Sequence, residues 1–233
     1  MYTLYIANKN YSSWSLRPWV LMRALGIPFE ERLVPFGTDA APHDFRVFSP
    51  NGKVPCLHDG DTVVWESLAI VEYLAERHEG VWPADANARA FARSAAAEMH
   101  AGFGALRQIC SMTCGLRVRL HRIEPQLHAD LQRLQAVWQE GLSRFGGPFL
   151  TGRAFSAADA FFAPVAFRIQ TYRPPLAPAA LTYSERLLAL APMRTWYAEA
   201  LAESWRDEAH EHQTLTVGTV TDDLRRPATA QNA

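Results

Sequence analysis

The sequence has little cysteine and no long apolar run. Three cysteines in 233 residues cannot form the disulfide framework of a small secreted domain, and they indicate a reducing compartment. No apolar run approaches the roughly 18 residues of a membrane-spanning helix. The first residues carry neither the basic segment nor the apolar core of a signal peptide. We therefore expect a cytoplasmic protein without a membrane partner.

The sequence also lacks an excess of charge and most motifs that mark a cofactor. Its 23 basic and 24 acidic residues leave a formal net charge of −1, which gives no global basic field for nucleic acid. It contains no G-x-G-x-x-G after a strand and no G-K-[ST], so nucleotide binding has no support. Its eight histidines are scattered and form no zinc-helix motif. We expect neither a nucleic-acid partner nor a metal.

The residues that are present divide the chain near residue 80. Before this point, runs of β-branched and aromatic residues alternate with helical stretches, and after it the sequence is rich in Ala and Leu and almost entirely helical in pattern. We expect an α/β domain over residues 1–80, an all-α helical domain over 86–210, and a poorly ordered tail over 211–233.

The first 80 residues predict the order strand, helix, strand, loop, hairpin, helix. Pro18 is expected in the first turn of the first helix, where proline is tolerated. Asp59-Gly60-Asp61 is expected to join the hairpin, because Asp-Gly between two β-type runs is a strong turn signal. The strands are expected at 2–7, 29–36, 54–58 and 62–65, and the helices near 16–24 and 68–75.

The rest of the chain predicts helices. Residues 88–119 are expected to be helical, with Cys110 and Cys114 as buried free thiols. Apolar residues step by three or four over 125–145 and predict a helix there. The Ser156 to Asp159 spacing is that of a capping box. A last helix is expected from about residue 192 to 203.

Three short segments carry polar residues suited to chemistry, and the first places Ser12, Ser13 and Ser15 between a strand and a helix. Serine at a helix start ordinarily caps the helix. The alternative is that one hydroxyl points at a bound anion, because a helix N-terminus leaves free N–H groups and carries partial positive charge.

The other two segments are Val54-Pro55 and Glu66-Ser67. A proline that opens a strand is either an ordinary edge-strand residue or a cis-proline kept for a function. Ser67 is either a helix N-cap or a ligand for a carboxylate, with Glu66 binding an ammonium group. The functional interpretation of this pair suits an amino-acid head group.

At these spacings the three segments resemble the thioredoxin-like domain of a cytosolic glutathione S-transferase of the serine type. The S-S-W-S-L-R pattern at 12–17 resembles the S-S-C-S-W-R of the zeta class, also called maleylacetoacetate isomerases, with departures at Trp14 and Leu16. The motifs at 54–55 and 66–67 resemble the glutathione-binding motifs of that superfamily. The S-A-A-D sequence at 156–159 resembles the capping box of its helical domain, so the resemblance covers about residues 1–210.

The resemblance implies a catalytic role for Ser12, whose hydroxyl would donate to the thiolate of glutathione. Ser13 and Ser15 are neighbours that can substitute or assist. Because a serine cannot form a mixed disulfide, a thiol reductase is disfavoured.

The resemblance also implies which residues hold glutathione. Val54 would offer its backbone to the cysteinyl part, as in the addition of a strand to a sheet edge, and cis-Pro55 would shape this edge. Glu66 and Ser67 would hold the γ-glutamyl head, and Lys53 would reach the glycine carboxylate.

The function implied by the resemblance is glutathione transfer to an electrophilic small molecule, a detoxification reaction, by a homodimer. A glutathione-dependent isomerase or peroxidase is an alternative, as is a non-catalytic glutathione-binding or regulatory protein of the same fold. The electrophile is expected between the two domains. His100, Phe103 and Arg107 are candidates for that pocket, although ordinary core and surface roles fit each of them equally well.

Overall fold

The computed structural model describes residues 1–37 and 43–227. Its N-terminal part is a four-stranded sheet in the order β2-β1-β3-β4, in which β1 is parallel to β2 and the other neighbours are antiparallel. The strands are β1 (Tyr2–Ile6), β2 (Phe29–Leu33), β3 (Cys56–Asp59) and β4 (Thr62–Trp65), and a short 3-10 helix, η1 (Phe45–Val47), precedes β3.

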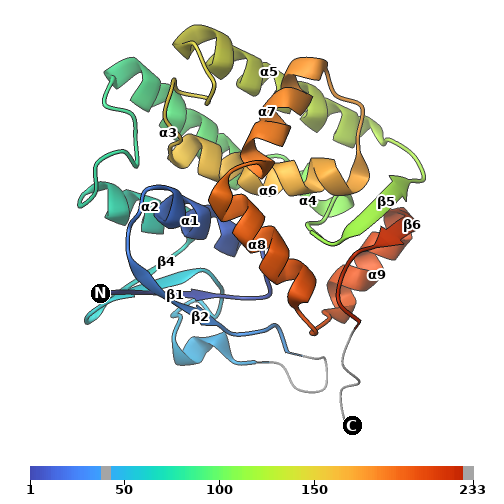
Figure 1. Ribbon diagram of the computed structural model, residues 1–233, viewed down its shortest axis with the longest axis horizontal. Coiled ribbons are helices and arrows are strands. Elements are labelled where there is room, and N and C mark those ends of the chain that lie inside the picture. Colours follow the sequence, from blue (N-terminus) through green and yellow to red (C-terminus); the bar gives the residue numbers. More distant parts are fainter. Residues whose placement is uncertain (38–42, 228–233) are drawn as a thin grey trace.

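Two helices connect this sheet to the rest of the molecule. Because parallel strands need a crossover, α1 (Ser13–Ala24) links β1 to β2, and α2 (Ser67–Ala75) follows β4 directly. Figure 1 shows both helices between the sheet and the helical part. Leu16 and Trp19 of α1 are buried, and α1 packs against both α2 and the central helix of the second part. This layer carries the start of α1 into the interior of the molecule.

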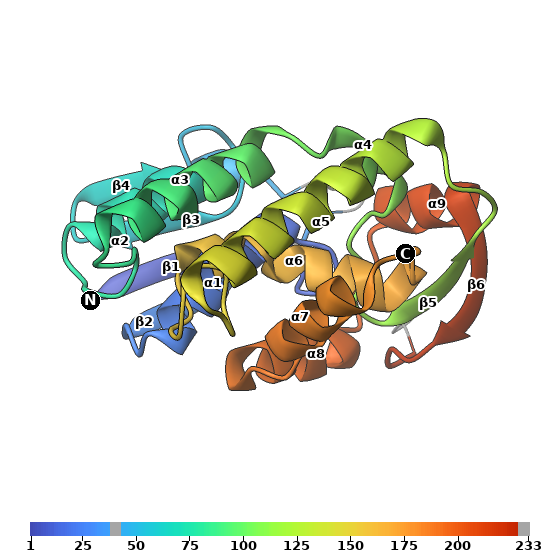
Figure 2. The same ribbon diagram turned by 90° about the horizontal axis from the view of Figure 1, so that it is seen from above.

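The second part is helical and is centred on α6. Helix α6 is buried along almost its whole length and packs against α1, α3 and α7. Figure 2 shows it behind α5, near the middle of the molecule. The α/β fold followed by helices that the sequence predicts is confirmed. The helices are α3 (Ala86–Ala101), α4 (Gly104–Ile109), α5 (Pro125–Phe145), α6 (Ala157–Tyr172), α7 (Pro178–Leu188) and α8 (Ala191–Ala202).

The single helical stretch expected over 88–119 is wrong. Helix α3 ends at Ala101, Gly102 caps it, and Phe103 takes a left-handed conformation with a φ of 54° before α4 begins. After α4 the chain forms β5 (Leu116–Leu120), in which Leu116 and Val118 are buried while Arg117 and Arg119 are more exposed. This alternation has the period of two that is typical of a strand.

The C-terminal segment also departs from the expected tail. Residues 211–227 are ordered: they continue α9 (Glu208–Val217) and form β6 (Gly218–Asp223), which pairs antiparallel with β5. The ladder supplies backbone partners for a polar sequence that has little apolar surface of its own. The end of the expected tail, 228–233, lies outside the described residues.

Two smaller differences from the expected pattern concern helices α1 and α7. Helix α1 begins at Ser13, so Pro18 lies inside the helix rather than in its first turn. Helix α7 was not predicted from the sequence.

In the described part of the chain, no helix combines the length and the apolar character needed to cross a membrane.

Candidate active site

A cleft of about 440 Å³ lies where the start of α1 meets the helical part. The sheet side contributes residues 11–14, Phe36, Phe45 and residues 52–54. The opposite wall comes from the helical part and the C-terminal segment, and it consists of Arg107, Ser111, Met112, Arg168, His210 and Gln213. The cleft therefore combines hydroxyl groups, aromatic rings and two guanidinium groups.

The hydroxyl cluster lies at the N-terminus of α1. Ser12 occupies the N-cap position and lines the cleft, yet its side chain makes no capping hydrogen bond. Its Oγ instead donates to Ser15 Oγ at 2.7 Å, and Ser15 Oγ also accepts the backbone N–H of Ala7 at 3.4 Å. The hydroxyl of Ser12 is therefore available for a role other than capping.

Ser13 and Ser15 differ in their access to the cleft. Ser13 lines it, and its Oγ accepts a hydrogen bond from Arg168 at 3.3 Å, which leaves the Ser13 O–H group as a donor. Ser15 is fully buried and touches the cleft only through Ser12. Of the three predicted hydroxyls, Ser12 and Ser13 reach the cleft directly.

The segment before β3 forms the facing edge on the sheet side. Lys53 and Val54 line the cleft, whereas Pro55 is buried behind them and does not. The Val54–Pro55 peptide bond is cis, as the resemblance implies. The structure thus brings Ser12, Ser13, Lys53 and Val54 together around one space.

Glu66 and Ser67 lie at the start of α2, outside the wall of this cleft. Ser67 is fully buried, and its Oγ accepts a hydrogen bond from Arg17 at 3.4 Å. Glu66 is exposed and has a φ of 71°, a left-handed conformation that is unusual for a residue other than glycine. Asn51 Nδ2 lies 3.5 Å from the Glu66 carboxylate and links this turn to the segment before Lys53.

Of the three residues considered for the second pocket, only Arg107 lines the cleft. His100 lies edge-on to the ring of Trp14 with centroids 5.2 Å apart, and Phe103 is buried where α3 turns into α4. His100 therefore supports the cleft from behind, through Trp14.

Sequence reasoning missed most of the opposite wall, above all Arg168 on α6. This arginine stands in an otherwise apolar stretch, F-F-A-P-V-A-F-R-I, and only 5% of it is exposed. A lone charge on a fully buried helix needs a partner, and that pattern is a signal that the sequence did carry. No such signal in the sequence marks the other residues of the cleft that sequence reasoning missed, which are Tyr11, Phe36, Phe45, Ser111, Met112, His210 and Gln213.

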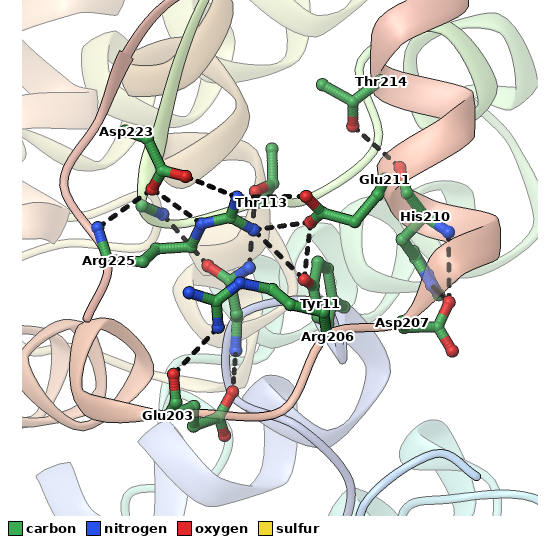
Figure 3. A network of polar contacts seen from close by, with 12 residues as sticks. Tyr11, Thr113, Glu203, Arg206, Asp207, His210, Glu211, Thr214, Asp223 and Arg225 are labelled. Atoms are coloured by element: carbon green, nitrogen blue, oxygen red, sulfur yellow. Dashed lines mark hydrogen bonds and ion pairs between the residues drawn. The ribbon is translucent and has the colours of Figure 1, made fainter. Parts of the chain in front are cut away.

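The C-terminal segment is tied to the cleft by a network of polar contacts (Figure 3). Tyr11 Oη donates to Glu211 Oε1 at 2.6 Å, and Arg225 binds both Glu211 oxygens at 2.5 and 3.0 Å. Arg225 also pairs with Asp223 at the end of β6. These bonds hold α9, with His210 and Gln213, against the mouth of the cleft.

None of the three cysteines lines the cleft. Cys56, Cys110 and Cys114 are buried and unbridged, and burial raises the pKa of the Cys110 thiol to about 12. Among residues 1–37 and 43–227, no group of three or more His, Cys, Asp or Glu side chains is arranged to hold a metal ion. A thiolate in this site would have to come from a ligand.

Comparison with known proteins gives a family for the first part of the chain. The family model described as "Glutathione S-transferase, N-terminal domain" matches residues 11–77. The "Glutathione S-transferase-like protein OpS6" of Beauveria bassiana is 26% identical over 76% of this chain and 83% of its own length. A "Glutathione S-transferase zeta class" of Euphorbia esula is 28% identical over 66% of this chain and 70% of its own length.

Solved structures share the fold over most of the chain. A glutathione transferase homolog from Burkholderia with bound glutathione has a TM-score of 0.62 and 23% identity, over 85% of this chain and 97% of that one. A theta class glutathione S-transferase from Xanthomonas axonopodis pv. citri, also with glutathione bound, has a TM-score of 0.61 and 21% identity, over 84% and 96%.

Proposed function

Because the chain belongs to the glutathione S-transferase superfamily, we propose that it transfers glutathione to an electrophilic small molecule. In this proposal the Ser12 hydroxyl stabilises the glutathione thiolate, which attacks the electrophile. The observation that carries the proposal is the position of Ser12, uncapped at the start of α1, on the wall of a cleft that also contains Lys53 and Val54. The glutathione bound by the solved relatives supports it.

The interactions of a thiolate with one hydroxyl group and one helix N-terminus are strong enough to lower the thiol pKa as this step requires. A free thiol has a pKa near 8.5, and lowering it by about two units requires roughly 2.7 kcal/mol in favour of the anion. A hydrogen bond to a charged partner contributes about 1.5–3 kcal/mol, and a helix N-terminus adds about 0.3–1 kcal/mol. Ser12 therefore acts as a donor, and no general base is needed.

The hydrogen bond between the Ser12 and Ser15 hydroxyls provides a way to turn the Ser12 O–H group toward the thiolate. Ser12 donates to Ser15 in the structure, and one O–H group cannot donate to two acceptors. When a thiolate arrives, reversal of this bond makes Ser15 the donor to Ser12 and turns the Ser12 O–H toward sulfur. The Ala7 N–H that donates to Ser15 polarises the chain in the same direction.

We assign the rest of glutathione to the sheet side of the cleft and to the start of α2, outside the cleft wall. Val54 would pair with the cysteinyl backbone, and Lys53 would reach the glycine carboxylate. Glu66 and Ser67 would hold the γ-glutamyl head, and the positive φ of Glu66 supports this role because strained residues gather at ligand sites.

The experiment is a glutathione titration by calorimetry, combined with the ultraviolet absorbance of the bound thiolate as a function of pH. The wild type should bind glutathione with a thiol pKa about two units below the free value of about 8.5. The Ser12→Ala variant should bind with similar affinity but should raise the bound thiol pKa by at least about one unit, since one charged hydrogen bond is lost.

Ser13→Ala and Ser15→Ala are the matched controls. Ser15→Ala should raise the pKa of the thiol by less than Ser12→Ala does, because it removes only the second hydroxyl of the pair. A larger effect of Ser13→Ala would transfer the donor role to Ser13. Absence of glutathione binding would refute the enzyme, and binding with an unshifted thiol would leave a binding protein.

We also propose the homodimer that the family implies. Sedimentation velocity at micromolar concentration should give about twice the 26.1 kDa of one chain. A single species of one-chain mass would refute this state.

A further inference from the structure

Three arginines gather at the cleft without a carboxylate partner. Arg17 and Arg168 are buried, with 1% and 5% of their surfaces exposed, and Arg107 is half-buried beside them. Within the described residues 1–37 and 43–227, no carboxylate oxygen lies within 4.0 Å of a guanidinium nitrogen of any of the three. Such uncompensated buried charge is costly and is found where a charged ligand completes the site.

The existing partners of these arginines are neutral. Arg168 donates to the carbonyl oxygens of Arg107 and Cys110 and to Ser13 Oγ, while its Nε has no partner. Arg107 donates to the carbonyl oxygen of His100 at 3.0 Å. Within the described residues, no hydrogen-bond partner of these guanidinium groups carries a negative charge.

The neighbouring charges add to the effect of burial on Arg17. Burial, followed by the neighbouring guanidinium groups of Arg107 and Arg168, lowers the pKa of Arg17 to about 9. Glu66 is the carboxylate that opposes this effect. A negatively charged group placed among these arginines would relieve this repulsion.

Two of the three arginines face the cleft. Arg107 and Arg168 line it on the wall opposite Lys53 and Val54, and Trp14 lines it between the hydroxyl cluster and Arg107. The Arg17 and Arg107 guanidinium groups lie 3.9 and 5.4 Å from the centroid of the Trp14 ring, so the part of the ring that lines the cleft adjoins cationic groups. A planar molecule with an acidic group matches this pair of surfaces.

From this arrangement we propose that the second substrate is a planar electrophile with a carboxylate or similar acidic group, bound by Arg107 and Arg168. The inference rests on the proposed transferase function, in which glutathione occupies the sheet side of the cleft. The acidic group anchors the electrophile on the helical wall and leaves its reactive carbon beside the thiolate near Ser12.

The test uses 4-chloro-3,5-dinitrobenzoate and its methyl ester. In both reactions the thiolate forms a carbon–sulfur bond, the carbon–chlorine bond breaks, and chloride leaves with the electron pair. Each kcat/KM is divided by the uncatalysed rate constant with glutathione, since the ester is intrinsically more reactive. The acid should then exceed the ester by roughly tenfold or more, as expected for charged hydrogen bonds.

Arg107→Gln is the main variant, and Arg194→Gln on the exposed side of α8 is the matched loss of one charge. Arg107→Gln should lower the normalised kcat/KM for the acid by about tenfold and change that for the ester, and the affinity for glutathione, less than about twofold. Arg194→Gln should leave all three unchanged. Equal losses for acid and ester, or a matching loss of glutathione affinity, would overturn the inference.

A binding measurement separates this inference from the proposed function. Calorimetry with the unreactive 3,5-dinitrobenzoate and its methyl ester reports the anion site whether or not the protein transfers glutathione. The acid should bind at least about tenfold more tightly, and Arg107→Gln and Arg168→Gln should each remove that preference. A protein that binds glutathione and converts the ester but shows no preference for the acid would refute the inference alone.

Discussion

Glu66 is the residue whose backbone most clearly departs from its intrinsic preference. Its φ of 71° and ψ of 130° place a residue that has a Cβ in a backbone region that favours glycine. A conformation of this kind costs on the order of 1–3 kcal/mol and persists where the surroundings impose it. The strain lies at the start of α2, next to the buried Ser67.

This strain predicts different outcomes for two substitutions of Glu66. Glu66→Gly should be more stable than Glu66→Ala by about 1 kcal/mol, because glycine adopts the positive φ without the Cβ penalty. Both variants should lose glutathione affinity, because both lose the carboxylate. Chemical denaturation and calorimetry measure the two effects, and equal stability of the two variants would contradict the strain.

At the scale of single residues, the sequence marked the segments that hold Ser12 and Val54 by a helix start and by a proline beside a strand. The family resemblance then singled out the two residues, and the structure places both on the cleft. Arg168 lines the same cleft from a position more than 150 residues after Ser12 in the chain. Its place there depends on how α6 packs against α1, and no local pattern encodes that packing.

At the scale of elements, the start of α6 is fixed by one buried carboxylate. Asp159 accepts the backbone N–H groups of Ser156 at 3.0 Å and Leu150 at 2.9 Å, and the hydroxyl of Tyr183 at 2.7 Å. The capping box predicted from the sequence is confirmed, and the structure extends it to the loop before α6 and to α7. The helix that carries Arg168 is thereby set against its neighbours.

Asp159→Ala should therefore destabilise the protein by about 3–5 kcal/mol, since it leaves the donors of Leu150, Ser156 and Tyr183 without their buried acceptor. The matched control is Asp85→Ala at the start of α3. Asp85 accepts one N–H bond at a partly exposed helix end, so about 1 kcal/mol is expected there. Urea unfolding of both variants gives the comparison, and equal losses would refute the special role of Asp159.

The elements also show where sequence patterns fail. Helix α5 was predicted at its observed bounds, Pro125–Phe145, because its apolar residues keep one helical period and a proline and a glycine mark its ends. The region after α3 carries conflicting signals. The Ala-rich sequence of α3 favours a helix, but Gly102 ends that helix, and β5 needs β6, a partner about 100 residues away. Pairing at that distance overrides local propensity.

At the scale of the whole molecule, Glu203 joins the end of α8 to the loop after β1. Its carboxylate accepts the backbone N–H groups of Lys9 at 2.5 Å and Asn10 at 3.1 Å. Burial raises the pKa of Glu203 from an ordinary value of 4.5 to about 7, although these two N–H groups and the charges of Lys9 and Arg206 act in the opposite direction.

This shift predicts a pH dependence of stability. The folded chain keeps the Glu203 proton to higher pH than the unfolded chain does, so between about pH 4.5 and 7 it binds more protons. The contribution of this group is fully present below pH 4.5 and is lost as the pH rises through 7. The free energy of unfolding should fall by at most about 1.4 kcal/mol per pH unit across this window.

Urea unfolding at several pH values measures that slope. Glu203→Gln cannot ionise, so it should remove this part of the slope while it keeps one oxygen acceptor. Identical slopes for the wild type and Glu203→Gln would show that Glu203 titrates at the same pH in both states.

The hydrogen bond between Tyr11 and Glu211 has a consequence for the order in which the chain folds during its synthesis. The two residues are 200 positions apart, and β6, which follows Glu211, pairs with a strand made about 100 residues earlier. A nascent chain on the ribosome can fold its sheet and most of its helices before this last segment emerges. The mouth of the cleft closes only when that segment is released, so a truncated or stalled chain would have the fold but not a finished binding site.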